Sequence, residues 1–126
     1  MIKPDMADAY FGLGNAYSKI GMYKEEVEAY KQAVRIKPDY AVAYYNLGVV
    51  YGENLKMYKE AIEAFKQAIV INPGDSNTHY NLGIIYLLSH DRDSALAEYK
   101  ILKHLSPELA NEIFVLIYKP VASSRN

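Results

Sequence analysis

A Leu-Gly pair recurs along the chain at a nearly constant interval, and this regularity limits the folds that the chain can adopt. The pair begins at residues 13, 47 and 82, so the two steps are 34 and 35 residues. A tyrosine follows each pair, and each unit closes with a proline at 38, 73 or 107. Self-similarity at such a period is typical of chains built from stacked repeats. The interval predicts three repeats, at about residues 7–40, 41–75 and 76–109.

Each repeat has the hydrophobic spacing of two helices, helix A and helix B. In the first repeat, residues three and four apart share one face of helix A, namely Tyr10, Leu13, Gly14 and Tyr17. Helix B repeats the spacing with Val27, Tyr30, Ala33 and Val34. Because proline disfavours helix in the preceding residue and fits a first helical turn, the prolines separate one pair from the next.

We therefore predict six helices in antiparallel pairs and a seventh, capping helix at about residues 107–118, behind an N-cap at Ser106. A short tail follows at 119–126, and residues 1–126 form one domain. The extra residue of the second interval is expected in the turn at 54–57, because a loop absorbs an insertion at little energetic cost.

Glycines inside helix A predict close packing of the pair. Glycine in a helix interior costs about 1 kcal/mol relative to alanine, so its recurrence at 14, 48 and 83 needs a reason. We expect helix B to approach too closely for a side chain, with Ala61 and Ala95 as the facing residues. The substitution Gly48→Leu should then damage the fold.

Composition excludes several classes of function. The net charge is -1 and the pI about 6.3, so no basic surface for nucleic acid is expected. The chain has no cysteine, and its three histidines lack ligand spacing, so we expect no metal, no cofactor and no catalytic residues. No apolar run approaches the roughly 20 residues that span a bilayer, and no signal sequence opens the chain. We therefore expect no direct membrane insertion and a cytoplasmic location.

Over residues 4–107 the chain resembles the tetratricopeptide repeat family. The second repeat carries the family pattern at eight positions, Tyr44, Leu47, Gly48, Tyr51, Ala61, Phe65, Ala68 and Pro73. The chain departs from the pattern at Glu26, where a small residue is usual, at His79 in place of the first aromatic, and at Leu102 in place of the late alanine. The resemblance implies an all-α, right-handed superhelical solenoid of antiparallel helix pairs, and a non-catalytic scaffold for protein–protein interaction.

The resemblance also implies a concave groove, lined by the A helices, that binds a peptide or an extended partner segment. Its residues are the helix A positions that point away from the glycine: Asp8, Phe11, Asn15, Lys19, Val42, Tyr45, Val49, Glu53, Asn77, Tyr80, Ile84 and Leu88. Many of them are aromatic or aliphatic, which predicts an apolar or amphipathic partner segment. Alternatively, the aromatics fill the space between neighbouring A helices.

Some members of the family bind acidic C-termini of chaperones through a clamp of Lys, Asn and Arg. Of the positions that form that clamp only Asn15 matches, so this class of partner is not expected.

The two ends of the chain suggest self-assembly as an alternative function. Residues 2–5 copy residues 36–39, the end of a repeat, so we expect the chain to be a fragment of a longer array. Near the other end, residues 113–117 are apolar on every side of the capping helix, although a terminal cap needs a polar face. We therefore expect a concentration-dependent homo-oligomer through the terminal helices.

Overall fold

The computed structural model describes residues 4–119, and all regular structure in that range is helical. Residues 1–3 and 120–126, including nearly all of the expected tail, lie outside the described residues. The chain divides into two compact units between Pro73 and Gly74. The first unit holds α1 (Pro4–Lys19), α2 (Tyr23–Ile36), α3 (Ala41–Val49), the π-helical turn η1 (Val50–Asn54) and α4 (Tyr58–Ile71). The second unit holds α5 (Ser76–Leu88), α6 (Arg92–Leu105) and α7 (Pro107–Tyr118). The all-α fold with seven α-helices is confirmed for residues 4–119.

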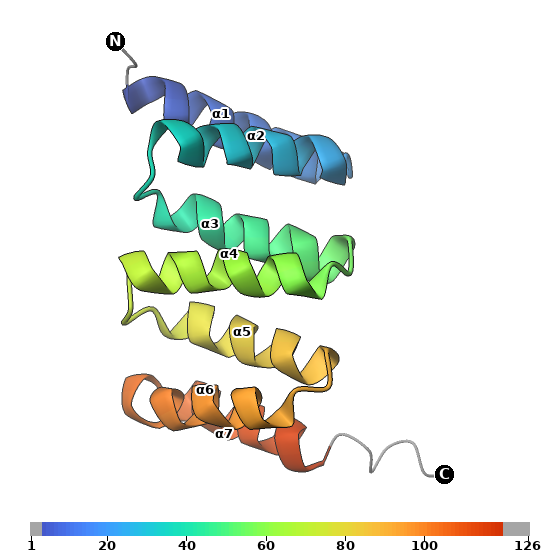
Figure 1. The fold of residues 1–126 in the computed structure, drawn as a ribbon, viewed down its shortest axis with the longest axis vertical. Coiled ribbons are helices and arrows are strands. Elements are labelled where there is room, and N and C mark those ends of the chain that lie inside the picture. The colour runs from blue at the N-terminus through green and yellow to red at the C-terminus, as the bar shows by residue number, and fades with distance from the viewer. Residues whose placement is uncertain (1–3, 120–126) are drawn as a thin grey trace. The chain divides into compact units, whose positions relative to one another are not determined.

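In the first unit, α1 packs against α2 and α3 packs against α4, and α2 also contacts α3 (Figure 1). The large side chains at the centre of the two pairs are Tyr30 of α2 and Phe65 of α4, each 1% exposed. Small residues such as Ala33 and Ala43 are fully buried beside them. Each helix B thus contributes one aromatic ring to the core of its own pair.

The glycines of the first unit make room for these rings. A Cβ atom on Gly48 would lie 2.5 Å from Cε1 of Phe65, and a Cβ on Gly14 would overlap the ring of Tyr30. The close approach was therefore predicted correctly, but the nearest group is the ring of Phe65 and not the predicted Ala61. A flat ring fills the space over a glycine better than the single methyl group of an alanine.

The turns between helix A and helix B share one backbone conformation. Gly21, Lys56 and His90 all have positive φ, at 76°, 57° and 65°. In each turn the next backbone N–H donates to the carbonyl of the repeated tyrosine, for example Met57 to Tyr51 at 2.8 Å. The prediction that the turn at 54–57 holds the extra residue of the second repeat is wrong, because the three turns match. The extra residue lies before this turn. It widens the end of the preceding helix into η1, where Leu55 N–H donates to Val50 O over 3.0 Å.

In the second unit, α7 packs against both α5 and α6 (Figure 1). The predicted N-cap is present, because the Ser106 hydroxyl accepts a hydrogen bond from Leu109 N–H at 3.3 Å. A Cβ on Gly83 would overlap Ile113 of α7 and lie 3.5 Å from the Cβ of Glu98, so Ala95 is not the facing residue either. Ile113 is fully buried, as is Leu102 of α6. The glycine of this repeat therefore accommodates the capping helix instead of a ring on helix B.

Candidate functional site

A polar cluster lies between the two helix pairs of the first unit. The Tyr30 hydroxyl donates to Asn15 Oδ1 at 2.6 Å. Asn46 Nδ2 of α3 donates both to that hydroxyl, at 3.3 Å, and to Asn15 Oδ1, at 3.4 Å. Burial raises the pKa of Tyr30 to about 12, against a smaller opposite effect of Asn46 and with the nearby Glu26 adding to it. The phenol is therefore a neutral hydrogen-bonding group at any ordinary pH.

This cluster forms one wall of an open cavity of about 350 Å³. Three of the predicted groove residues, Asn15, Lys19 and Val49, line the cavity, so α1 and α3 bring them together. The remaining lining residues are Ser18, Glu26, Tyr30 and Asn46. The surface at this point is more polar than the predicted apolar groove.

The N-terminal end of α1 holds two further groove residues. Phe11 is partly buried between aromatic rings, with centroids 5.7 Å from Tyr30 and 5.1 Å from Tyr40. Asp8 accepts a hydrogen bond from the Tyr40 hydroxyl at 2.6 Å. Burial, together with this hydrogen bond and the charge of Asp8, raises the pKa of Tyr40 to about 12. Both residues thus bind α1 to the start of α3.

The other groove residues of the first unit differ in exposure. Tyr45 is partly buried and packs edge-on against Phe65, with ring centroids 5.8 Å apart. Val42 is 46% exposed, and Glu53 is exposed on η1. Phe65 belongs to helix B of the same repeat, so this contact does not place Tyr45 between neighbouring A helices.

In the second unit, α7 contacts the same face of helix A. The Tyr80 hydroxyl donates to Glu112 Oε1 at 3.3 Å, and burial, then the carboxylate of Glu112, raise the pKa of Tyr80. Ile84 and Leu88 line an open cavity of about 550 Å³ together with residues of α5, the following turn, the start of α6 and α7, namely Leu87, His90, Arg92, Leu116 and Ile117. Asn77 is exposed at the start of α5. The predicted groove residues of this repeat are therefore shared with the capping helix.

A buried polar pair replaces an apolar contact in the second unit. His79 Nδ1 lies 2.7 Å from Glu98 Oε1, and both residues are buried. The matching positions of the second repeat are Tyr44 and Ala64, which line one cavity in the first unit. From the sequence, His79 was identified only as a replacement for the first aromatic, because nothing in a spacing of 19 residues indicates that Glu98 faces it.

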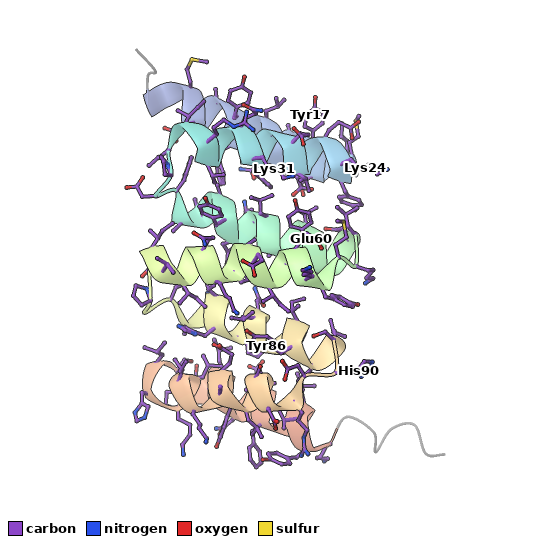
Figure 2. All side chains as sticks on the ribbon, viewed as in Figure 1. Tyr17, Lys24, Lys31, Glu60, Tyr86 and His90 are labelled. Carbon is purple, nitrogen blue, oxygen red and sulfur yellow. The ribbon has the colours of Figure 1, made fainter. Side chains whose placement is uncertain are left out.

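Helix A of the first repeat has a face without a partner in the first unit. Tyr10, Leu13 and Tyr17 line an open cavity of about 320 Å³ with α2 residues such as Lys24 and Glu28. The matching residues of the next repeat line a similar cavity, but Lys31 and Val34 of α2 also line that one. Figure 2 labels Tyr17 and Lys24 at the first cavity, and Lys31 and Glu60 at the second.

The exposed fractions of two matching leucines confirm that the cavity of the first repeat is less covered than that of the second. Leu13 is 43% exposed, whereas Leu47 at the matching position is 4% exposed. Leu13 is thus an unpaired copy of a core position. The predicted core face of the first helix is therefore only partly core.

Neither a candidate metal site nor a candidate membrane span lies within residues 4–119. No group of three or more His, Asp or Glu residues there is placed to hold a metal ion. None of the helices in that range combines the length and the hydropathy needed to cross a membrane.

Comparisons with known proteins place the chain among repeat proteins. Family models described as TPR repeat or tetratricopeptide repeat match residues 19–54, 41–75 and 64–99. No curated protein sequence matches the chain.

Solved structures give the same result. A crystal structure of MamA is 31% identical with a TM-score of 0.74, and the match covers 88% of this chain but only 60% of that one. The first TPR of Spaghetti (RPAP3), bound to the HSP90 peptide SRMEEVD, is 21% identical over 96% of this chain and 97% of that chain, with a TM-score of 0.85. The second TPR domain of human RPAP3, in complex with the HSP70 peptide SGPTIEEVD, is 22% identical over 93% and 99%, with a TM-score of 0.84.

Proposed function

This chain belongs to the tetratricopeptide repeat family, and on that premise we propose that it is a non-catalytic scaffold that binds a peptide or an extended segment of a partner protein. Two of the similar domains are complexes with short peptides, which supports a protein or peptide as the partner. We infer a cytoplasmic location on sequence grounds alone.

One observation carries the proposed place of binding. Asn15, Lys19 and Val49, taken from the sequence as groove residues, line a single cavity between α1 and α3. A cavity formed by two rigid helices positions its side chains more precisely than a loop does. The phenyl ring of Phe11 and the exposed side chain of Val42 extend this face in the first unit. We propose that a partner segment binds along it.

The chemistry of the face differs from what an acidic peptide needs. The peptides bound to the two RPAP3 domains end in Glu-Glu-Val-Asp. Here the cavity holds one lysine, Lys19, and one glutamate, Glu26, so it offers no net positive charge. We therefore infer a partner segment that is not acidic and that combines apolar with hydrogen-bonding groups.

Selection from a random peptide library on the immobilised chain tests the proposal. Peptides that bind should lose at least tenfold in affinity for Lys19→Glu and for Val49→Asp, because both changes alter the cavity wall. The control is Lys66→Glu, which makes the same charge change at an exposed position of α4. Equal losses in all three variants, or peptides insensitive to all of them, would place the binding surface elsewhere. Circular dichroism must show unchanged helix content in each variant.

Self-assembly is the second candidate, and the unpaired face of α1 favours it. In the first unit, Lys31 and Val34 of a preceding helix B complete the surface around Leu47, while the copy around Leu13 stays open. At the other end of the chain, α7 exposes Phe114, Val115 and Tyr118 to between 43% and 49%. Two partly exposed apolar faces that differ from each other would join copies head to tail.

Sedimentation equilibrium over a wide range of concentration tests this candidate. A mass that rises with concentration, and that falls to the monomer value for Leu13→Asp or Phe114→Ser, would support it. A monomer at every concentration would exclude it.

A further inference from the structure

Glu26 stands at a position where the other two repeats have a fully buried alanine. Ala61 of α4 and Ala95 of α6 occupy the matching sites, each with no exposed surface. Glu26 is itself only 4% exposed. Burying an ionised carboxylate without a partner is costly, so a charge at this place needs a compensating group.

The hydrogen bonds around Glu26 leave one of its oxygens unsatisfied. Within the described part of the chain, Oε1 is buried and has no hydrogen-bonding partner. The Tyr30 hydroxyl has a single proton, and that hydroxyl lies 2.6 Å from Asn15 Oδ1, so it cannot serve both Asn15 and the carboxylate. Asn46 Nδ2 is directed at Tyr30 and Asn15. Burial raises the pKa of the Glu26 carboxyl, and the nearby hydroxyl groups of Tyr30 and Ser18 offset this only in part.

Glu26 is one of the residues that line the cavity between α1 and α3, which is open to solvent. Ser18 and Lys19, in the last turn of α1, line it as well. The carbonyl groups at the C-terminus of a helix carry partial negative charge, which adds to the attraction of this site for a cation. Lys19 is the basic residue of the cavity wall, yet it is exposed, and no ion pair within 4.0 Å joins it to Glu26 among residues 4–119.

We infer that Glu26 is the anionic floor of a subsite that receives a basic side chain, lysine or arginine, from the segment bound along α1 and α3. An ammonium or a guanidinium group supplies N–H donors and a positive charge, which are what the buried carboxylate lacks. A volume of about 350 Å³ accommodates either group with part of its aliphatic stem. The asparagine amides and the Val49 side chain would then contact the rest of the basic residue. The inference rests on the proposed function for the origin of the cation, although the subsite itself can be tested without any peptide.

Ethylguanidinium and ethylammonium chloride are suitable probes, titrated into the isotopically labelled full chain at pH 8 and constant ionic strength. Nuclear magnetic resonance should show saturable shifts confined to the cavity residues, with no such shifts from ethylurea, which has a similar shape and no charge. The pKa of the Glu26 carboxyl should fall by about one pH unit when either cation is bound, as expected for an opposite charge in contact.

Variants separate a specific site from general attraction of cations. Glu26→Gln should weaken cation binding at least tenfold, and Glu26→Ala, which restores the residue of the other repeats, should do the same in a folded chain. Glu25→Gln, at an exposed neighbouring position of α2, should leave binding unchanged. Equal binding by Glu26→Gln and the unmodified chain, or the absence of saturable shifts, would overturn the inference.

Lys19→Gln tests whether the chain provides its own cation. If this change leaves the pKa of Glu26 as it is and binding of the probes persists, the subsite is free to accept an external group. If it raises that pKa, Lys19 already neutralises Glu26 and the inference is overturned. A failed peptide selection together with specific binding of the cations would refute the proposed function and leave the subsite standing.

Discussion

The two units use the same Leu-Gly motif for different contacts. In the first unit, the glycine of helix A lies against the aromatic ring of its own helix B, as Gly48 does with Phe65. In the second unit the matching Gly83 lies against Ile113 of α7, and the aromatic of helix B, Tyr99, is only partly buried. Tyr99 packs instead against Phe114, with ring centroids 5.4 Å apart. A glycine thus reserves space, and the neighbouring elements determine what fills it.

Removing the two helix B aromatics should show the largest difference between the units. Phe65→Ala should cost about 3 to 5 kcal/mol of unfolding free energy, because a fully buried ring is lost. Tyr99→Ala should cost less than half as much, while Ile113→Ala should cost about 2 to 5 kcal/mol in the same unit. Urea denaturation of the three variants measures the order. Equal losses for Phe65→Ala and Tyr99→Ala would contradict the comparison.

Filling the glycines should sharpen the same contrast. Gly48→Leu should destabilise the chain by about 3 kcal/mol, because the Phe65 ring would have to leave the core. Gly48→Ala should still cost about 1 to 2 kcal/mol. Gly83→Ala should be within about 1 kcal/mol of the unmodified chain, since the nearest atom is the end of a flexible side chain, Ile113 Cδ1, and alanine favours helix. Thermal and urea unfolding report these values, and an unchanged Gly48→Leu would refute the close approach.

The His79–Glu98 pair should be replaceable by the residues of the second repeat. Glu98→Ala alone should cost about 1 to 3 kcal/mol, because it removes a hydrogen-bonding partner of a buried imidazole. The double variant His79→Tyr with Glu98→Ala, which copies Tyr44 and Ala64, should recover most of that loss. A double-mutant cycle in urea measures the coupling. If the changes in unfolding free energy of the two single variants add up to that of the double variant, the contact between His79 and Glu98 does not stabilise this repeat.

The carboxyl of Glu26 should make the stability of the first unit depend on pH, in contrast to the alanines of the other repeats. Burial raises its pKa above the ordinary 4.5. The carboxyl group therefore contributes fully to the stability of the fold below pH 4.5, and this contribution is lost as the pH rises through the raised pKa. The stability of Glu26→Gln relative to the unmodified chain should therefore increase from pH 4 to pH 8. Glu25→Gln, which is exposed, should show no such trend. A constant difference across this range would show that Glu26 is adequately solvated.

Substitutions in the matching turns between helix A and helix B should change the unfolding free energy least. Lys56 and His90 adopt the left-handed conformation that Gly21 adopts without strain. Lys56→Gly should stabilise the chain by about 0.5 kcal/mol, because the relief of strain exceeds the entropy that glycine loses on folding. Gly21→Ala should destabilise it. Careful urea titrations resolve changes of this size, and a loss of stability in Lys56→Gly would contradict the role of this conformation.

Three of the seven residues that line the cavity were predicted as groove residues, but the chemistry of the cavity was not. The family resemblance implied that Asn15, Lys19 and Val49 line one groove, and the structure brings all three to one cavity. The cavity is polar because Glu26, Tyr30 and Asn46 line it. Helical spacing alone either assigns these residues to the interior or does not decide where they lie. Glu26 gave a signal as a departure from the pattern of small residues. Asn46 and Glu112 gave none, because their partners are 15 or more residues away.

The sequence by itself determined the local structure of this protein. Repeat spacing, prolines and the Ser106 cap specify seven helices, since each of these signals acts within a few residues of the chain. Only the tertiary structure decided that a ring lies on Gly48 and an isoleucine of α7 on Gly83, and that the inserted residue widens η1. It also left Glu26 Oε1 without a partner beside an open cavity. Such contacts depend on the packing of side chains far apart in the chain, which a periodic pattern does not encode.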